Sequence, residues 1–221
     1  MSLIVKICGI DSIAAADAAI AGRADFCGLT FHPASPRNLG PDAARALAAR
    51  LNGRCRVVAL VCDPLDDQVA SVVSMVKPDF LQLHGKESPA RLAAIRHRFG
   101  IALIKALPVA TDDDFGMVAS YEPVADMLLF DAKPPSSASR PGGHGAPFDW
   151  RLMRGRRFAR PWLLAGGLDP DNVARAVAIS GARGVDVSSG VESQPGIKNP
   201  ERIAAFIANA RAAEHTAEVR E

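Results

Sequence analysis

Residues 185–198 read Val-Asp-Val-Ser-Ser-Gly-Val-Glu-Ser-Gln-Pro-Gly-Ile-Lys, and this stretch indicates the fold of the chain. Its first apolar run stops at Ser188, Ser189 and Gly190. Two hydroxyls and a glycine directly after a strand form a site of the size of a phosphate. One predicted strand earlier, the run 163–165 ends in the same way at Gly166 and Gly167. A single Gly-Gly is an ordinary turn, but two such ends in succession are typical of the phosphate site after strands 7 and 8 of a (β/α)8 barrel.

Eight short apolar runs recur along the chain, with predicted helices between most of them. The runs are 3–8, 26–31, 56–62, 79–83, 102–107, 126–130, 162–165 and 184–187. This alternation indicates a parallel sheet, and eight units indicate a closed one. An open doubly wound sheet is the alternative, but it usually carries its glycine-rich loop after the first strand. We therefore expect an α/β protein, a single-domain (β/α)8 TIM barrel with a parallel eight-stranded barrel over residues 1–213, followed by a polar C-terminal tail over 214–221.

The composition disfavours several classes of protein. With 48% apolar residues in 221, the chain can bury a sizeable core, and its net charge is only +2. Five arginines between 151 and 160 lack base-stacking aromatics, so we interpret them as a solvated helix face and expect no nucleic-acid partner. No apolar run reaches ~18 residues, so we expect no membrane partner.

The cysteines indicate a cellular compartment. Cys8, Cys27, Cys55 and Cys62 show no C-x-x-C pairing, and no signal peptide precedes them. The chain is therefore predicted to be a reduced, cytoplasmic protein.

Two residues at predicted strand ends could move protons, and chemistry in a barrel collects at the carboxyl ends of its strands. Cys8 follows Lys6 by two residues on the same face, and a neighbouring ammonium favours the thiolate of a base or nucleophile. Asp131 follows an apolar run whose walls favour a protonated carboxyl, as a general acid requires. Taken alone, a strand cysteine is most often a small core residue, and a strand-end aspartate is often a cap or loop anchor.

Arg37 and His84 are further candidates. Arg37 lies in the loop after the second strand, where it could grip a carboxylate or simply be an exposed loop residue. His84 ends the fourth strand and could bind a ligand, but we favour hydrogen bonds to neighbouring loop carbonyls. The other histidines show no metal-ligand spacing with one another or with cysteine, so we expect no metal. No dinucleotide fingerprint appears, and we expect no cofactor.

Six separated motifs occur in a characteristic order. They are Lys6-Ile7-Cys8-Gly9, Ser35-Pro36-Arg37, Gln82-Leu83-His84-Gly85, Gly142-Gly143 followed by Phe148-Asp149-Trp150, Leu164-Ala165-Gly166-Gly167-Leu168 with Asn172-Val173, and Val185 to Glu192 with Pro195-Gly196 and Lys198. In these motifs the chain resembles the phosphoribosylanthranilate isomerases of tryptophan biosynthesis, from Val5 to about Phe206. It departs from the family pattern at Asp11 and His144, where the family usually has threonine.

The resemblance implies an Amadori rearrangement of N-(5-phosphoribosyl)anthranilate to 1-(2-carboxyphenylamino)-1-deoxyribulose 5-phosphate. It implies that Cys8 takes the proton from C2, that Asp131 protonates the furanose oxygen, and that Arg37 holds the anthranilate carboxylate. The implied phosphate site consists of Gly166, Gly167, Ser188, Ser189 and Gly190, with His84 and Gly143 as possible substrate contacts. The expected partner is a small-molecule phosphosugar substrate, and the chain is expected to be a monomer or homodimer.

Two other functions compete with this one. The related isomerase of histidine biosynthesis acts on a substrate with two phosphates, but those relatives use two aspartates, whereas the first strand here ends in Cys8. A non-catalytic binder of phosphate ligands would bind tightly without turnover, and the presence of both a candidate acid and a candidate base disfavours it.

Overall fold

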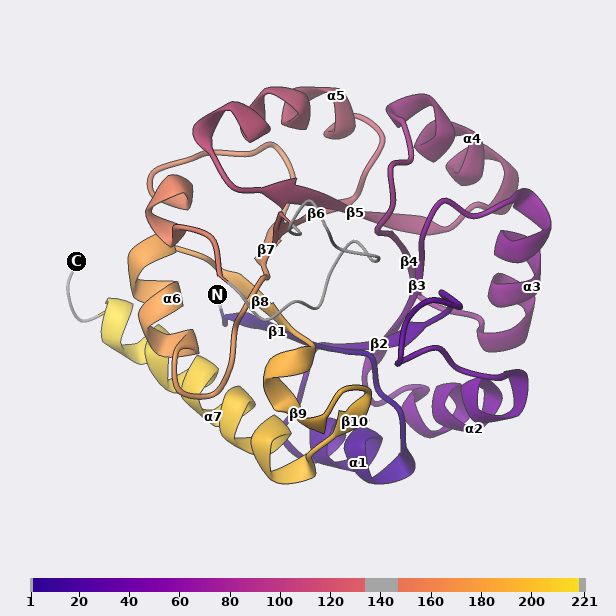
Figure 1. Cartoon of the computed structure of the whole chain (residues 1–221), viewed down its shortest axis with the longest axis horizontal. Coiled ribbons are helices and arrows are strands. Elements are labelled where there is room, and N and C mark those ends of the chain that lie inside the picture. The colour runs from indigo at the N-terminus through magenta and orange to yellow at the C-terminus, as the bar shows by residue number, and fades with distance from the viewer. Residues whose placement is uncertain (1, 134–146, 219–221) are drawn as a thin grey trace.

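The strands form a closed parallel barrel surrounded by helices (Figure 1). A computed structural model of the chain describes residues 2–133 and 147–218, with side chains described as far as residue 213. Within those residues the barrel strands run in the order β1 to β8, and β8 pairs with β1. Their bounds are β1 Ile4–Cys8, β2 Phe26–Thr30, β3 Arg56–Val61, β4 Phe80–Leu83, β5 Ala102–Val109, β6 Met127–Ala132, β7 Trp162–Leu164 and β8 Gly184–Val187. The predicted barrel is confirmed, and the open sheet is excluded.

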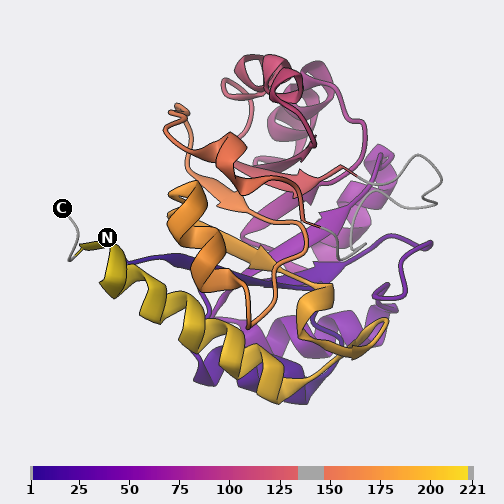
Figure 2. The ribbon, with the colours of Figure 1, turned by 60° about the vertical axis from the view of Figure 1, so that its left-hand side comes forward.

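The helices lie around the outside of the barrel, and Figure 2 shows the long C-terminal helix crossing its outer side. Their bounds are α1 Ile13–Ala21, α2 Pro41–Leu51, α3 Asp66–Val76, α4 Pro89–Phe99, α5 Val118–Tyr121, α6 Val173–Ser180 and α7 Pro200–Glu218, with 3-10 turns η1 Asp112–Met117, η2 Trp150–Met153 and η3 Ser189–Val191. Local residues set their ends. Ser12 and Ser88 accept hydrogen bonds from the first turns of α1 and α4, and left-handed Gly100 and Gly181 end α4 and α6.

Two apolar layers hold the barrel together. The larger layer packs the outward strand side chains against the helices. The smaller one fills the barrel interior with inward-facing residues of the strands and, directly after β7, Ala165: Phe26, Val58, Ile104, Ala106, Met127, Leu129, Leu163 and Ala165. Because side chains alternate along a strand, Asp131 shares the inward face of β6 with Met127 and Leu129. The inward-facing side chains of β6 below Asp131 are therefore apolar.

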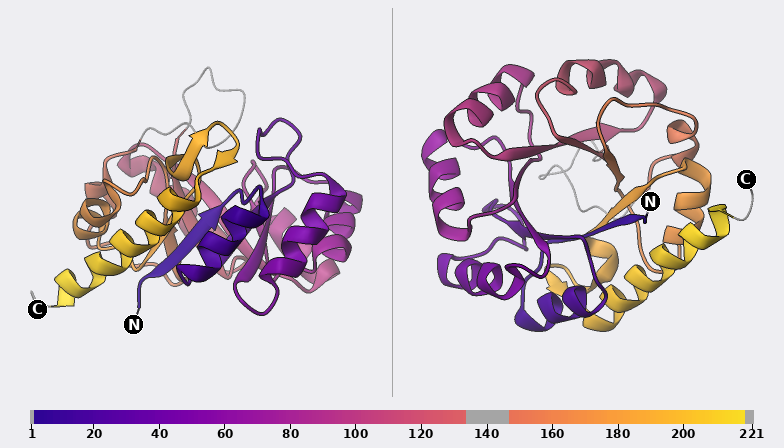
Figure 3. Two further views of the ribbon diagram at one scale, coloured as in Figure 1. Left: turned by 90° about the horizontal axis from the view of Figure 1, so that it is seen from below. Right: turned by 180° about the vertical axis from the view of Figure 1, so that it is seen from behind.

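The β9–β10 hairpin stands at the end of the barrel opposite the two termini (Figure 3, left). Its strands, β9 Glu192–Gln194 and β10 Ile197–Lys198, pair antiparallel between β8 and α7. The turn of the hairpin is pressed against the β2–α2 loop, because a Cβ at Gly196 would lie 2.6 Å from the main-chain oxygen of Pro36. The sequence did not predict this hairpin, which fixes residues at the barrel mouth.

Three segments differ from expectation. Between β5 and β6, residues 112–121 form a 3-10 turn followed by the short α5 and not one continuous helix. The arginine-rich stretch is not a helix face. Beyond η2 its residues reach to neighbouring segments, as Arg160 does by donating from Nε to the main-chain oxygen of Glu122 at 2.7 Å. Helix α7 continues past residue 213 to Glu218. The predicted boundary between barrel and tail therefore does not coincide with the end of a helix, and it stays a prediction.

Among the described residues, no helix combines the length and the apolar character that crossing a lipid bilayer requires.

Candidate functional site

Cys8 ends β1 on the inward face and is 5% exposed. Its register partner on β2 is Gly28, and a Cβ at Gly28 would lie 3.0 Å from Cys8 Sγ. A glycine at this position is therefore what gives the thiol its space. Two residues below, Lys6 is fully buried and donates from Nζ to Oδ1 of Asp186 on β8 at 2.7 Å. The predicted neighbourhood of Lys6 and Cys8 is present, and it contains a carboxylate that sequence reasoning did not place there.

The charges around Cys8 act against one another. Burial raises the pKa of the Cys8 thiol, Lys6 and Lys198 lower it in part, and Asp186 raises it again. The pKa of Lys6 is itself raised: burial alone would lower it, but Asp186 and Cys8 outweigh that effect. As expected from the sequence, Lys6 lowers the pKa of Cys8. Burial has the larger effect, however, and the pKa of the thiol is raised.

Asp131 lies near the end of β6 and has a histidine partner. Oδ2 of Asp131 is 3.2 Å from Nε2 of His84, and both side chains are 13% exposed. On the other side of the ring, Nε2 of Gln82 is 2.9 Å from His84 Nδ1. The ring nitrogens of His84 thus contact two side chains at the inward face of the barrel. The favoured interpretation, that His84 satisfies loop carbonyls, is wrong for these contacts.

The orientation of the Gln82 amide determines which ring nitrogen of His84 carries a proton. With Nε2 of Gln82 donating to Nδ1, a neutral His84 ring carries its proton on Nε2 and donates it to Asp131. Gln82 is fully buried, and its Oε1 has no hydrogen-bond partner among the described residues. If Asp131 carries the proton instead, the amide must rotate to offer Oε1 to Nδ1–H. The side chains of Gln82, His84 and Asp131 therefore form one row of contacts on the inward face of the barrel.

Arg37 is not an exposed loop residue. Its side chain is 7% exposed, and its Nε and Nη2 donate to Oε1 and Oε2 of Glu192 at 2.6 and 2.8 Å. The methylene stem crosses Gly9, where a Cβ would lie 2.7 Å from Arg37 Cδ. Lys198, also buried, donates to Glu192 Oε1 at 2.8 Å. The two strands of the unpredicted hairpin thus supply the groups that hold Arg37.

Asp11, one of the two departures from the family pattern, anchors this hairpin. Its Oδ2 accepts a hydrogen bond from the backbone N–H of Lys198 at 3.0 Å, and its Oδ1 lies 3.2 Å from Ser12 Oγ. Ser12, and not Asp11, caps α1. The substitution therefore attaches the hairpin to the loop after β1. The other departure, His144, lies outside the described residues, as does the predicted contact Gly143.

The predicted phosphate residues lie at adjacent strand ends. Gly166 and Gly167 follow β7 with φ of 82° and 66°, a region that favours glycine, and a Cβ at Gly166 would lie 2.5 Å from the backbone nitrogen of Ala132. Ser189 and Gly190 lie in η3, directly after Ser188 at the end of β8. A Cβ at Gly190 would lie 1.9 Å from the main-chain oxygen of Leu168, so the two loops pack backbone against backbone.

A buried cation lies beside this pair of loops. Lys198 donates from Nζ to the main-chain oxygen of Ser188 at 2.8 Å and to its Oγ at 3.3 Å. Burial lowers the pKa of Lys198, and Glu192 offsets this in part. The strand end that was expected to bind phosphate therefore has a positive charge beneath it that sequence reasoning missed.

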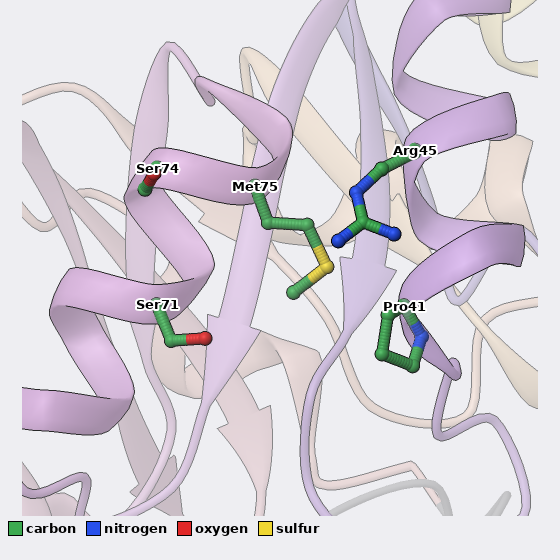
Figure 4. A pocket seen from close by; sticks show the side chains of 5 residues that line it. All are labelled: Pro41, Arg45, Ser71, Ser74 and Met75. Atoms are coloured by element: carbon green, nitrogen blue, oxygen red, sulfur yellow. The ribbon is translucent and has the colours of Figure 1, made fainter.

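Other parts of the described chain offer less. Within residues 2–133 and 147–218, no three histidine, cysteine or acidic side chains converge as metal ligands do. A hollow of about 330 Å³ opens between α2 and α3, lined by Pro41, Arg45, Ser71, Ser74 and Met75 (Figure 4). It lies in the outer helical layer, whereas the candidate acid and base lie at strand ends inside the barrel.

Comparison with known proteins gives consistent matches over nearly the whole chain. The family model for N-(5'-phosphoribosyl)anthranilate (PRA) isomerase matches residues 5–209. The N-(5'-phosphoribosyl)anthranilate isomerase of Rhodopseudomonas palustris (strain BisA53) is 53% identical over 214 residues, which are 97% of this chain and 98% of the relative.

Solved structures give the same result. Phosphoribosyl anthranilate isomerase from Thermotoga maritima superposes with a TM-score of 0.85 at 34% identity, covering 95% of this chain and 99% of that one. A structure of such an isomerase in complex with reduced 1-(o-carboxyphenylamino)-1-deoxyribulose 5-phosphate has a TM-score of 0.80 at 31% identity, with the same coverage of both chains.

Proposed function

The chain belongs to the family of N-(5'-phosphoribosyl)anthranilate isomerases, and from that premise we propose which of its residues carry the reaction. The reaction converts N-(5'-phosphoribosyl)anthranilate to 1-(2-carboxyphenylamino)-1-deoxyribulose 5-phosphate, a step of tryptophan biosynthesis. Of the three functions that the sequence left open, the family selects the isomerase. The substrate is a small phosphosugar, with a phosphate at one end and an aromatic carboxylate at the other.

The reaction moves protons and breaks one C–O bond. Protonation of the furanose ring oxygen lets the nitrogen lone pair expel it from C1', which gives a Schiff base and a hydroxyl at C4'. Loss of the proton from C2' gives an enolamine. Tautomerisation then places a proton on C1' and a ketone at C2', so the product is an isomer of the substrate. The enzyme has to supply a general acid, a general base and a means of holding both ends of the substrate.

Cys8 is the proposed general base. It lies on the inward face at the end of β1, and Lys6 and Lys198 both lie close enough to lower the pKa of its thiol. Burial keeps the thiolate scarce in the free protein, but a base of raised pKa binds a proton strongly once it is formed. The two nearby ammonium groups of Lys6 and Lys198 stabilise that thiolate.

Asp131 is the proposed general acid. It lies on β6, three strands from Cys8 around the ring through β8 and β7, and therefore faces the substrate from a different side. The ring of His84, 3.2 Å away, can share a proton with it. This contact supports a second role for His84, as the group that returns a proton to Asp131, in addition to the predicted substrate contact.

The two ends of the substrate are held by different loops in this proposal. Phosphate binds at Gly166, Gly167, Ser188, Ser189 and Gly190, where two glycine-rich strand ends pack together and Lys198 lies beside Ser188. Arg37 binds the anthranilate carboxylate from the β2–α2 loop. This placement extends the substrate across the end of β1, where Cys8 lies.

The observation that carries the assignment is the joint placement of Cys8 and Asp131 on inward faces of one barrel. Cys8→Ala and Asp131→Asn should each reduce turnover by about 10²–10⁴-fold, measured as loss of fluorescence of phosphoribosylanthranilate generated in situ. Cys62→Ala is the matched control, a second cysteine at the same end of the barrel, directly after β3, and it should retain near-native turnover. Full activity of both Cys8→Ala and Asp131→Asn would overturn the assignment.

Location and assembly remain proposals. The four cysteines are all free, which supports the cytoplasm as the site of action. The chain is proposed to be a monomer or homodimer, which sedimentation analysis would distinguish.

A further inference from the structure

Three buried side chains form one ion-pair cluster at the barrel mouth: Arg37, Glu192 and Lys198. Glu192 lies between the two cations, and their side chains are 7%, 4% and 0% exposed, respectively. The proposed function uses only Arg37. Glu192 and Lys198 occur in the motifs of the last strand ending but have no assigned role.

The hydrogen bonds of Glu192 occupy its whole carboxylate. Oε1 accepts from Arg37 Nε at 2.6 Å and from Lys198 Nζ at 2.8 Å. Oε2 accepts from Arg37 Nη2 at 2.8 Å and from the backbone N–H of Gly196 at 3.1 Å. A carboxylate has about four lone-pair sites, so Glu192 retains no acceptor for another donor. The pKa of Glu192 is lowered: burial acts to raise it, but Arg37 and Lys198 outweigh that effect.

Lys198 is equally occupied. Its ammonium group has three N–H donors, and three acceptors surround it: Glu192 Oε1, the main-chain oxygen of Ser188 and Ser188 Oγ. Glu192 and Lys198 therefore have no free group with which to contact a substrate directly.

Arg37 is the member of the cluster with donors left over. A guanidinium has five N–H donors, and Glu192 takes one from Nε and one from Nη2. These two lie on the side edge of the group. Among the described residues nothing accepts from the end edge, formed by Nη1 and Nη2. It keeps one N–H on each nitrogen, which is the spacing that a second carboxylate needs for a bidentate pair. The packing of the stem over Gly9 fixes the direction in which this edge points.

The charges of the cluster do not balance. Two cations against one carboxylate leave one net positive charge among side chains that are less than a tenth exposed. An unbalanced buried charge is unfavourable, and a ligand carboxylate on the end edge of Arg37 would neutralise it.

We propose that Glu192 and Lys198 are positioning residues that select a substrate carrying a carboxylate. Glu192 binds the side edge of Arg37 and so presents the end edge to the anthranilate carboxylate. Lys198 fixes Glu192 and, through Ser188, joins this cluster to the strand end of the phosphate site. The two ends of the substrate are thereby bound by one connected network. The inference rests on the proposed role of Arg37.

The test measures how much the substrate carboxylate contributes to binding. The probes are reduced 1-(o-carboxyphenylamino)-1-deoxyribulose 5-phosphate and the same molecule without the carboxylate, each titrated calorimetrically into the full-length protein. The Kd of the probe without the carboxylate, divided by the Kd of the probe with it, measures the contribution of the carboxylate to binding. The double variant Glu192→Gln/Lys198→Met keeps the net charge of the cluster at +1 but removes the clamp on Arg37. Its ratio should fall about 10–100-fold towards one, as expected for a lost charge-assisted hydrogen-bond pair.

Two further variants separate the possible outcomes. Arg37→Met removes the side chain that is proposed to bind the carboxylate, so the ratio of Kd values for this variant should approach one. Glu192→Asp keeps every charge but shortens the clamp, so its ratio should fall even if the double variant does not fold. A collapsed ratio in Arg37→Met with native ratios in the Glu192 variants would overturn this inference and leave the proposed function intact. A native ratio in Arg37→Met would overturn the role of Arg37 itself.

A control distinguishes the clamp from general loss of stability. Lys105 and Glu87 form another buried ion pair, 2.5 Å apart, with Lys105 on the outward face of β5. The variant Lys105→Met/Glu87→Gln should unfold at a lower temperature yet keep the native ratio of Kd values. If the ratio of Kd values in this control also falls towards one, the loss in the Glu192 variants reflects general destabilisation and the inference fails.

Discussion

Gly28→Ala tests whether the space beside Cys8 is required for activity. Gly28 is the register partner of Cys8, and the backbone N–H groups of Gly9 and Ile10 both donate to its main-chain oxygen at 2.9 Å. A Cβ added to Gly28 would lie 3.0 Å from Cys8 Sγ and 3.1 Å from Cys8 Cα. Carbon atoms in favourable contact lie about 3.5–4.0 Å apart, so the alanine cannot be accommodated without movement.

The expected magnitude follows from those distances. Movement of the sulfur relieves only the contact with Sγ. The contact with Cys8 Cα also requires the adjacent backbones of β1 and β2 to shift apart, so we expect the sulfur to be displaced by roughly half an ångström. A displacement of about 1 Å at a reacting group can cost 10²-fold in rate, so we expect kcat/KM to fall about tenfold, which is about 1.4 kcal/mol of transition-state stabilisation. Overpacking should also cost about 1–3 kcal/mol of folding free energy.

The assay is fluorescence loss of phosphoribosylanthranilate, with thermal unfolding measured on the same samples. Gly116→Ala is the matched control, because a Cβ there meets no atom within 4 Å and its φ is not positive. That control should keep native activity. Native kcat/KM in Gly28→Ala would refute the reasoning, since it would mean that the sulfur position is either not disturbed by the methyl group or not important for the reaction.

Three other perturbations have defined outcomes. Lys105→Met leaves the buried carboxylate of Glu87 unpaired and should cost about 3–5 kcal/mol in chemical denaturation, and a cost below about 1 kcal/mol would contradict the burial of the pair. The pKa of Asp114 is about 2, chiefly because the backbone N–H of Thr111 binds its carboxylate. A depressed pKa contributes stability above the unfolded value and loses it in acid, so Asp114→Asn should be less stable than the parent at neutral pH, with the difference closing between about pH 4 and pH 2. Because burial raises the pKa of Cys8, kcat/KM should still be rising at about pH 9, and a plateau reached below neutral pH would argue against Cys8 as the base.

The barrel could be predicted because each of its strands is marked by a short, local pattern in the sequence. Each strand is a short apolar run bounded by glycine or polar residues, and the order of strands and helices along the chain determines the topology. The β9–β10 hairpin carries no such signal. Its strands have three and two residues, and Ile197 is half exposed, so no periodic apolar pattern marks them. Tertiary contacts hold the hairpin in place, for example the hydrogen bond that the backbone N–H of Lys198 donates to Asp11.

The sequence placed the proposed reactive groups at the mouth of the barrel, but it did not indicate the side chains that contact them. Cys8 and Arg37 occur in short recognisable motifs, and Asp131 directly follows an apolar strand run. Glu192 lies 155 residues from Arg37, and a pairing at that separation leaves no trace in local spacing. The apolar run before Asp131 suggested no partner for its carboxylate. His84 contacts Asp131 because β4 and β6 both place side chains on the inward face of the barrel.

One long-range pair could have been inferred from the sequence alone. Lys6 stands at an inward position of an apolar strand, and Asp186 stands in the apolar run of the last strand. A charge inside an apolar barrel requires an opposite charge near it. Closure of the barrel makes the first and last strands neighbours, and the register sets Lys6 opposite Asp186. The two charges cancel beneath Cys8, whereas the cluster on Arg37 at the mouth keeps one positive charge. The lower pair is therefore balanced internally, whereas the proposal made for the upper cluster is that a ligand carboxylate balances it.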